Sequence, residues 1–538
     1  MSYKISDLNI KFLGINPVLK DKTGELKPED IAALSALLTF RGKSVKALYE
    51  EAKEKGQDID EKVLKILRKS SLRGHASIAT TPVFSFNYEA SKFIDTLFTG
   101  IVFSSSLMAS GRRTDTTPDD IVYPDQIADD PKLKKDYEEQ SIEIIKFLKE
   151  SIKAGLDKDA TAKILHYGIY GTGIISLSIE SLVGFKREYE AEREWMPKEA
   201  GLFLEAIEKE LKNLGVLNLY ATRLEAPRDI YPFPNILKNP NEKNLARELI
   251  EKEELPQKNF RIESLEVIDS EELKTRLKNL KELEKETFSS KEKIKTGWKK
   301  LLEEKRKICR DFGQAINVKV LSRVAWRAWG EKKRHRTVPM IPDSLYFATE
   351  RAREFLSGYS EKIKEKNLSK EELSEIDRFF AISPELKKEE NKNFLYRYLE
   401  VGLNALNCYE KLIEKGVKPS EAIYIVPRAV KLDILQEYNL YNLLSGYYPV
   451  RTCSTVEEHL QSMTLKELSA IQKKLRELGQ DEVAQAMKIK CELVGFCLEE
   501  KSCGRVKKSV PDFDDEFHKA MFDSLEKGFQ QNLREIEG

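Results

Sequence analysis

A long stretch rich in lysine and glutamate divides this sequence into two parts. From residue 272 to residue 307 the chain reads "ELKTRLKNLKELEKETFSSKEKIKTGWKKLLEEKRK". Mixed charge runs of this kind are typical of solvated helix faces, so we predict a helical connector or a hairpin that packs on one face only. With 538 residues the chain is too long for a single hydrophobic core. We therefore expect a lobe over 1–237, a connector over 238–307 and a second lobe over 308–538.

The two lobes share an order of local patterns. In the first, "TPVFSFNYEA" alternates Phe84, Phe86 and Tyr88 with small or polar residues, as a half-buried strand does. From about Ser91 the apolar residues recur at helical spacing. Each half ends this series with a similar helical segment, "SLVGF" at 181–185 and "NLLSGY" at 442–447. We predict a diverged duplication of an α/β fold, in which each lobe is rich in helix and contains a small sheet.

The bulk composition restricts the classes of partner. Lysine and arginine number 91 against 90 aspartate and glutamate, so no long-range field draws the chain to nucleic acid or to an anionic membrane. No run approaches the roughly 20 apolar residues of a spanning helix, and "MSYKISDLNI" lacks the apolar stretch of a signal peptide. Six cysteines are few for this length and favour a reducing compartment. We expect a cytoplasmic protein that binds neither membranes nor nucleic acid.

One basic triplet stands out in a chain whose charges nearly cancel. "KKRHRTVPM" places Arg334, His335 and Arg336 together, although the chain has only five histidines. Two forked guanidinium groups with a histidine between them suit a pyrophosphate and an aromatic ring. Pro339 and Pro342 favour a loop or a helix end here. The plainer interpretation is a solvated basic cluster.

The triplet and its surroundings resemble the signature RHRxxSxxxxSxR of the flavin-dependent thymidylate synthases. In "SRVAWRAWGEKKRHRTVPMIPDSLYF" a helix-borne Ser322-Arg323 precedes the triplet, with three residues more than the family spacing. After the triplet Pro339 replaces the first serine of the signature, Ser344 matches the second, and Tyr346 replaces the arginine.

The first half matches the parts of the signature that the second half lacks. Nine residues after Ser91, Gly100-Ile101-Val102 stand in place of the triplet. Ser105 and then Ser110-Gly111-Arg112 fall on the family spacing. A serine, a glycine and an arginine suit a phosphate, although the same letters also suit an ordinary turn.

Two further stretches extend the resemblance. "GHASIATTPVFSF" resembles the histidine-and-serine stretch of the family, which makes His75 a flavin-orienting candidate, or else a helix cap. In "EAIYIVPRAVKLDILQEYNLYNLLSGYYPVRTCS" the spacing from Pro427 to Asn439 matches the family, and Arg451 matches a substrate-binding arginine after one insertion. Another family arginine is replaced by Ile423, and Lys163 stands at that place in the first half.

The resemblance implies a division of roles between the halves. Flavin binding is expected at Arg334, His335, Arg336, Asn439 and His75. Nucleotide binding is expected at Ser110, Gly111, Arg112, Lys163 and Arg451. The family builds its sites between the protomers of a homotetramer, so two copies of a duplicated chain would form a homodimer that is a pseudo-tetramer.

The family reaction is the reductive methylation of dUMP to dTMP. FAD, NADPH and methylenetetrahydrofolate supply the chemistry, so the resemblance assigns no catalytic residue in the protein. Two alternatives stay open. One is a non-catalytic relative that binds a nucleotide, RNA or a protein through the same basic clefts, and the other is a flavoenzyme that acts on another pyrimidine.

The cysteines form a separate candidate site. Cys491, Cys497 and Cys503 recur at six-residue steps, and Cys453 lies upstream. Four thiolates could hold zinc or an iron–sulfur cluster. Buried thiols or a disulfide are the alternative, because the spacing is not that of a CxxC hook.

Overall fold

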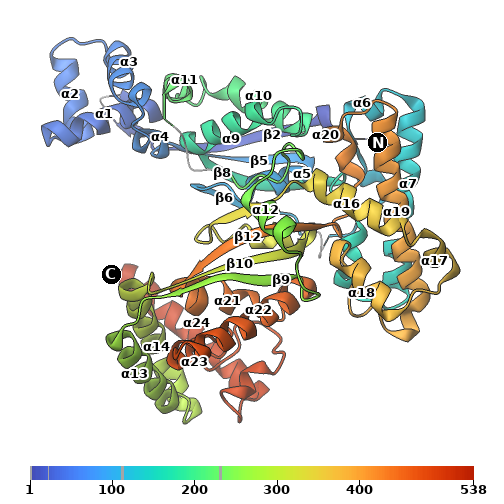
Figure 1. Cartoon of the computed structure of the whole chain (residues 1–538). Coiled ribbons are helices and arrows are strands. Elements are labelled where there is room, and N and C mark those ends of the chain that lie inside the picture. Colours follow the sequence, from blue (N-terminus) through green and yellow to red (C-terminus); the bar gives the residue numbers. More distant parts are fainter. Residues whose placement is uncertain (1–2, 22–23, 111–113, 229–232, 538) are drawn as a thin grey trace. The chain divides into compact units, whose positions relative to one another are not determined.

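The computed structural model describes residues 3–21, 24–110, 114–228 and 233–537 (Figure 1). It divides into two compact units, each made of three chain segments. Unit 1 comprises Met1–Asn244, Ala325–Arg336 and Pro342–Leu432, and unit 2 comprises Leu245–Val324, Thr337–Ile341 and Asp433–Gly538. The unit boundaries thus differ from the boundaries that we expected at residues 237 and 307.

The elements of unit 1 come from both halves of the sequence. From the first half they are β1 (Tyr3–Lys4), β2 (Asn9–Asn16), β3 (Leu19–Asp21), β4 (Gly24–Leu26), α1 (Pro28–Arg41), α2 (Val45–Glu54), α3 (Ile59–Lys69), α4 (Ser77–Thr80), β5 (Val83–Ser91), α5 (Phe93–Phe98), β6 (Ser104–Met108), β7 (Val122–Tyr123), α6 (Asp125–Ala128), α7 (Pro131–Lys153), α8 (Lys158–Thr161), β8 (Tyr170–Ser178), α9 (Ile179–Ala191), α10 (Lys198–Glu210) and α11 (Leu217–Glu225). From the second half they are α15 (Trp326–Lys332), α16 (Leu345–Ser357), α17 (Ser360–Glu365), α18 (Lys370–Phe379), α19 (Lys392–Glu414) and α20 (Pro419–Ala422).

The sheet of unit 1 has the order β2-β5-β8-β6, with each neighbouring pair antiparallel. The alternation seen in the sequence is real, because Phe84, Phe86 and Tyr88 of the central strand β5 are all fully buried. Phe203 of α10 covers this face of the sheet, and its ring centroid lies 5.4 Å from that of Phe86. The strand and the helix after it, α5, are therefore positioned by one continuous core.

Two long helices from different halves pack against each other in unit 1. The helices α7 and α19 both have 23 residues. Asp130 caps the first turn of α7, and Pro131 is its first residue. Phe147 and Tyr398 meet with ring centroids 5.9 Å apart, and Asp136 pairs with Lys415 at 2.7 Å. Because this helix pair buries apolar faces from both halves, residues 342–432 belong with unit 1.

Unit 2 contains the second sheet and its helices. Its elements are α12 (Leu245–Lys252), β9 (Phe260–Val267), α13 (Glu271–Thr287), α14 (Lys291–Phe312), β10 (Ile316–Ala325), β11 (Met340–Pro342), β12 (Lys431–Asn439), the π-helical segment η7 (Asn442–Gly446), α21 (Tyr448–Arg451), α22 (Glu458–Glu477), α23 (Asp481–Ala486) and α24 (Asp515–Glu537), of which β10, β11 and β12 extend by one or two residues into unit 1.

The two sheets share one strand order. The second sheet has the order β11-β12-β10-β9. In both sheets the first and third strands along the chain form the edges, and the second and fourth form the centre. The prediction of an α/β fold that is rich in helix and has a small sheet in each half is confirmed.

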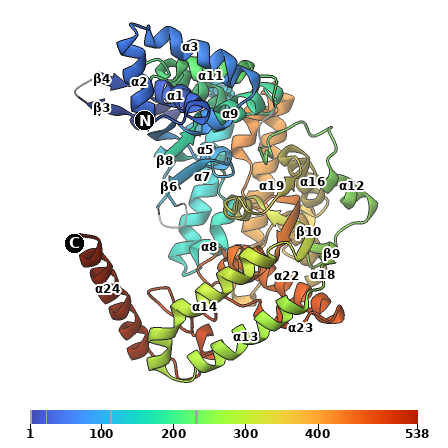
Figure 2. The same ribbon diagram turned by 90° about the vertical axis from the view of Figure 1, so that its left-hand side faces the viewer.

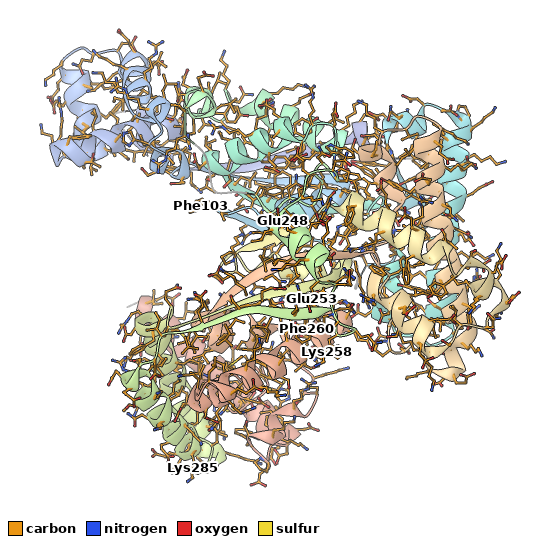
Figure 3. The ribbon with its side chains drawn as sticks, viewed as in Figure 1. Phe103, Glu248, Glu253, Lys258, Phe260 and Lys285 are labelled. Atoms are coloured by element: carbon orange, nitrogen blue, oxygen red, sulfur yellow. The ribbon has the colours of Figure 1, made fainter. Side chains whose placement is uncertain are left out.

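The lysine- and glutamate-rich stretch is part of the core of unit 2. Leu273, Leu277 and Leu280 of α13 are buried with Tyr438 and Tyr447 in one hydrophobic cluster. The connector expected over 238–307 also holds a strand that we did not expect, β9, which begins at the buried Phe260 (Figure 3). The hydrophobic residues are spaced at helical or strand periods, and the many charges lie on the other faces.

The described helices were also compared with the requirements of a bilayer. In the ranges that the structure covers, none of them has the length and the apolar character that crossing a membrane requires.

One buried lysine opposes the stability of unit 2. Lys305 of α14 is 2 % exposed, and its Nζ has no hydrogen-bond partner among the described residues. Burial lowers the pKa of Lys305 to about 8, although the carboxylate of Glu284 favours the charged form. Burial lowers the pKa of Lys305 below its unfolded value of about 10.4. The free energy of unfolding is therefore not reduced by Lys305 above that pH, where the amine is neutral, and the reduction becomes complete as the pH falls through 8.

Replacement of this lysine should stabilise the fold at neutral pH. We expect Lys305→Met to raise the free energy of unfolding at pH 7 by about 2–3 kcal/mol, because it removes a buried charge. The gain should shrink between pH 8 and pH 10.5, and urea unfolding followed by circular dichroism measures it. Lys300→Met, at an exposed position of the same helix, is the matched control and should change little. A loss of stability in Lys305→Met at pH 7 would contradict this expectation.

Candidate functional site

The basic triplet lies just after the end of α15, as its two following prolines led us to expect. Arg334 and Arg336 are exposed and His335 is half-buried. The side chain of Arg336 reaches the segment that follows α5. Its Nε donates to the carbonyl of Ile101 at 2.8 Å, and its Nη2 donates to Ser104 Oγ at 3.4 Å. The triplet of the second half therefore contacts the segment Gly100-Ile101-Val102, which stands in place of the triplet in the first half.

A second cation near the triplet holds the helix α5 itself. The Nζ of the buried Lys333 donates to the carbonyl of Thr96, which lies in α5. Carbonyl groups in the last turn of a helix lack intrahelical partners, so a cation is favourable there. Burial and the charge of Arg334 keep the pKa of Lys333 well below its ordinary value. Burial and Arg334 thus oppose the charged form of this amine, while the carbonyl of Thr96 accepts its hydrogen bond.

The carboxylate of Asp95 lies among these cations. It accepts a hydrogen bond from the hydroxyl of the buried Tyr88. Burial raises the pKa of Asp95, while Lys92, Arg334 and Lys333 oppose the shift. Lys92 is 5 % exposed, and its Nζ donates to the carbonyl of Ala109 at 2.7 Å. Ala109 directly precedes Ser110, so Lys92 fixes the start of the predicted phosphate-binding segment.

Two arginines extend the cationic group into the core of unit 1. Arg428 is 3 % exposed, donates from Nε to the carbonyl of Leu165 at 2.9 Å, and lies 4.9 Å from the ring centroid of Tyr167. Its Nη2 has no hydrogen-bond partner in the part of the chain that the structure describes. Burial lowers the pKa of Arg428 to about 10, with Tyr167 opposing and Arg327 adding to the shift.

We call these residues the basic cluster. Its members are Lys92, Arg327, Lys333, Arg334, Arg336 and Arg428. The sequence had marked only Arg334 and Arg336 as ligands. Arg428 could have been noticed, because it lies inside the apolar run "IYIVPRAV". A charged side chain is almost never fully buried in such a run unless it has a partner.

The other predicted residues of unit 1 lie in different surroundings. Ser110 is half-buried, whereas Gly111 and Arg112 lie outside the described residues. Lys163 is 1 % exposed, and its Nζ donates to the carbonyl of Asp159 at 2.9 Å, one turn back. This amino group therefore serves the local helix.

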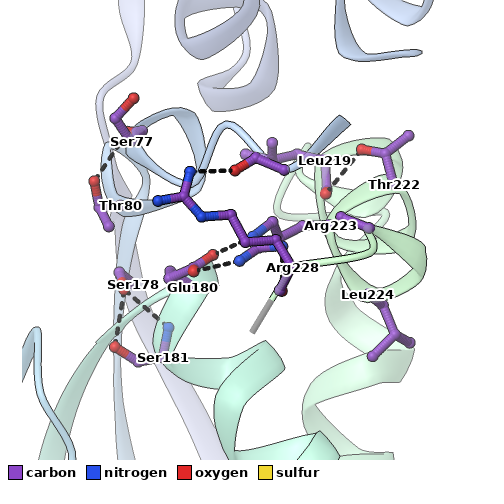
Figure 4. A network of polar contacts seen from close by, with 12 residues as sticks. Ser77, Thr80, Ser178, Glu180, Ser181, Leu219, Thr222, Arg223, Leu224 and Arg228 are labelled. Carbon is purple, nitrogen blue, oxygen red and sulfur yellow. Dashed lines mark hydrogen bonds and ion pairs between the residues drawn. The ribbon is translucent and has the colours of Figure 1, made fainter. Parts of the chain in front are cut away.

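His75 is exposed in a loop that an arginine network holds. Arg228 donates to the carbonyl of Gly74 at 3.1 Å (Figure 4). In the same network the buried Arg223 forms a two-pronged pair with Glu180 at 2.6 and 2.8 Å. The backbone of this loop is therefore fixed, and the imidazole of His75 faces solvent.

Asn439 and Arg451 belong to unit 2. Asn439 ends β12, and its Oδ1 accepts from Asn442 N and Nδ2 at 3.1 and 2.9 Å, so it caps the π-helical segment η7. Arg451 ends the short helix α21 and is half-buried. These two residues thus lie in a different unit from the triplet, and the relative placement of the units is not determined.

The sequence comparison placed Ser322-Arg323 on a helix before the triplet, and this prediction is wrong. Arg323 lies within β10, is fully buried and pairs with Asp433 at 2.6 Å. The backbone amide of Trp326 donates to Val430, as that of Lys92 donates to Ile169. Counted from these equivalent positions, Arg334 and Gly100 are each eight residues further on. The second half therefore needs no three-residue insertion.

The four cysteines of the candidate metal site are free thiols in unit 2. Cys491 and Cys497 are buried beside Phe496 and Phe513 in one hydrophobic cluster, and burial raises the pKa of Cys491 to about 12. Cys453 is also buried, and Cys503 is exposed. Within the described ranges no three histidine, cysteine or acidic side chains converge closely enough to hold a metal ion. The structure thus does not support the zinc or iron–sulfur site and favours the alternative of buried thiols.

Comparison with known proteins supports part of the sequence interpretation. Residues 273–475 match the family described as "Thymidylate synthase complementing protein", the flavin-dependent thymidylate synthases. The resemblance is therefore confirmed for this segment, which contains the triplet, Asn439 and Arg451. No curated protein matches the chain. Among solved structures, a UMP/dUMP methylase PolB from Streptomyces cacaoi, bound with 5-Br dUMP, matches at 10 % identity with a TM-score of 0.32 over 42 % of this chain and 100 % of that chain.

The two arginines of the triplet should differ in their effect on folding. Arg336 satisfies a backbone carbonyl, so we expect Arg336→Ala to lower the free energy of unfolding by about 1–2 kcal/mol. Arg334→Ala, at an exposed position two residues away, should change it by less than about 0.5 kcal/mol. Tryptophan fluorescence during urea unfolding measures both, since Trp195, Trp326 and Trp329 lie in unit 1. Equal effects of the two substitutions would contradict this difference.

Proposed function

We propose that this protein is a cytoplasmic flavin-dependent thymidylate synthase that converts dUMP to dTMP. The observation that carries the proposal is the family match over residues 273–475, which contains the triplet at the end of α15. The match supports a nucleotide methyltransferase-like enzyme. FAD, NADPH and methylenetetrahydrofolate are the cofactor and co-substrates of this proposal, and FAD supplies the redox chemistry when bound.

The charges of the basic cluster suit a phosphorylated ligand. Lys92, Lys333 and Arg334 act on the carboxylate of Asp95, and burial penalises charge in Lys92, Lys333 and Arg428. An anion beside them would offset their mutual repulsion. Arg428 Nη2 is a buried donor without a hydrogen-bond partner among the described residues. The donors present therefore fit the phosphates of a flavin dinucleotide or a nucleotide.

The residues would divide the work of binding. Arg334 and His335 contact the FAD pyrophosphate, and Arg336 orients them through its hydrogen bond to Ile101. Ser110, Gly111 and Arg112 bind the nucleotide phosphate, and Lys92 holds the carbonyl of Ala109 before them. Asn439 and His75 are further flavin-binding residues of this proposal, and Arg451 is a further nucleotide-binding residue. Lys163, whose amino group also donates to the carbonyl of Asp159, is the remaining nucleotide-binding residue of this proposal.

A diverged tandem duplication accounts for the two similar sheets. They have the same strand order. The helices α7 and α19 have 23 residues each, and the strands β8 and β12 that follow them have nine residues each. A homodimer of such a chain would reproduce a four-lobed assembly.

A non-catalytic relative is the second candidate. The observation that favours it is the loss of signature residues, because Gly100-Ile101-Val102 replaces one triplet and Tyr346 replaces one arginine. Such a protein would bind a nucleotide without turning it over. A flavoenzyme for another pyrimidine would bind FAD and convert a base other than that of dUMP.

The proposal predicts a specific loss of flavin affinity. We expect Arg334→Ala to weaken FAD binding about tenfold or more, since a charge-assisted hydrogen bond to phosphate contributes about 1.5–3 kcal/mol. Titration of the flavin absorption band measures the affinity. Arg68→Ala, at an exposed position on α3, is the control. Unchanged affinity in Arg334→Ala would refute the role of the triplet.

A turnover assay separates the candidate functions. The wild-type chain with FAD, NADPH and methylenetetrahydrofolate should produce dTMP from dUMP. Binding of dUMP without dTMP would favour the non-catalytic relative. Conversion of another pyrimidine nucleotide from a panel would identify the third possibility.

A further inference from the structure

The last helix of unit 2 is anchored in its first half, as far as Leu525. Phe517, His518 and Met521 of α24 are buried, and Lys291 of α14 pairs with Asp514 just before the helix. From residue 529 to residue 537 every side chain is exposed. Figure 2 shows α24 leading away from α14 toward the C-terminus. More than two turns of this helix therefore have no covering surface within their own unit.

The exposed part of α24 carries one apolar stripe. Phe522, Phe529, Leu533 and Ile536 are 39 %, 54 %, 37 % and 82 % exposed, and Leu525 is half-buried, because one side of it packs against the core of unit 2. At 100° per residue these five positions fall within about 40° on either side of Phe529. The stripe spans about 20 Å at 1.5 Å per residue. A helix in water does not favour so many exposed apolar groups on one line.

The stripe is symmetric about Phe529. Leu525 and Leu533 lie four residues before and after it, and Phe522 and Ile536 lie seven residues before and after it. Two antiparallel copies of this helix therefore place Phe529 against Phe529, Leu525 against Leu533 and Phe522 against Ile536. A surface that complements itself in this way is the requirement for a two-fold interface.

We propose that α24 pairs antiparallel with α24 of a second copy of this chain, with Phe529 at the two-fold axis. Burial of these side chains between the two helices removes their apolar surface from water, which favours the pair. The charges beside the stripe are complementary in this arrangement. Lys519 near the start of the helix and Glu537 at its end lie on the same side of the stripe. In the antiparallel pair each Lys519 approaches the Glu537 of the second copy.

The charge of α24 disfavours another kind of occupant. The helix carries six acidic residues and three lysine or arginine residues. A helix that lies on an anionic lipid surface is instead rich in lysine and arginine on its polar face. A second copy of the chain is therefore the occupant that the stripe fits.

Cysteine crosslinking of the full-length chain tests the register. Phe529→Cys should form an intermolecular disulfide when diamide is added, because the two residues 529 face each other. Lys527→Cys, on the opposite face of the same helix, is the matched control. Mass spectrometry of the digested product identifies a 529–529 link in the presence of the native thiols, of which Cys503 is exposed.

Two further variants fix the direction of pairing. Phe522→Cys alone should not crosslink to itself, whereas Phe522→Cys with Ile536→Cys should give a 522–536 link. A 522–522 link would show parallel pairing and overturn the antiparallel arrangement.

Sedimentation gives a second readout that needs no cysteine. We expect Phe529→Arg to weaken self-association at least about tenfold, while Gln531→Arg on the opposite face leaves it unchanged. Unchanged self-association in Phe529→Arg, together with no 529–529 link, would overturn the proposal. These readouts do not depend on flavin or nucleotide binding.

Discussion

The packing of α7 against α19 is the constraint on which unit 1 depends. These two 23-residue helices come from different halves of the sequence, and they bury Phe147 and Tyr398 against each other. Because α19 lies in unit 1, the chain on either side of it, residues 342–432, lies there too. The segment that carries the triplet, residues 325–336, also lies in this unit. The contact of Arg336 with Ile101 thus depends on an arrangement that joins the two halves.

The basic cluster shows how an interior can tolerate several cations. Lys92, Lys333 and Arg428 each donate to a backbone carbonyl, namely those of Ala109, Thr96 and Leu165. Each bond replaces a lost contact with water, while Asp95 balances only part of the charge. The group is therefore rigid in position and positive in sum. Such a group is prepared for an anion before the anion binds.

The sequence predicted those parts whose signal is local. The alternation of Phe84, Phe86 and Tyr88 identified β5, and the prolines after the triplet identified a helix end. The strand β9 was missed because its apolar residues lie in a stretch dominated by lysine and glutamate. Arg323 was assigned to a helix because its partner, Asp433, is 110 residues away and gives no local signal. Arg428 did carry a local signal, a charge inside an apolar run, but its contacts at Leu165 and Tyr167 lie in the other half of the chain and could not be read from the sequence.

The interleaving of the two units has a consequence for folding during synthesis. Unit 1 begins at the N-terminus, yet it needs residues as late as Leu432 to complete its core. A ribosome must therefore translate the whole of unit 2's first two segments, residues 245–324 and 337–341, before unit 1 can close. Until α19 emerges, Phe147 of α7 lacks the cover that Phe394 and Tyr398 give it in the finished fold. The nascent chain is thus an expected client for chaperones that bind exposed apolar helices.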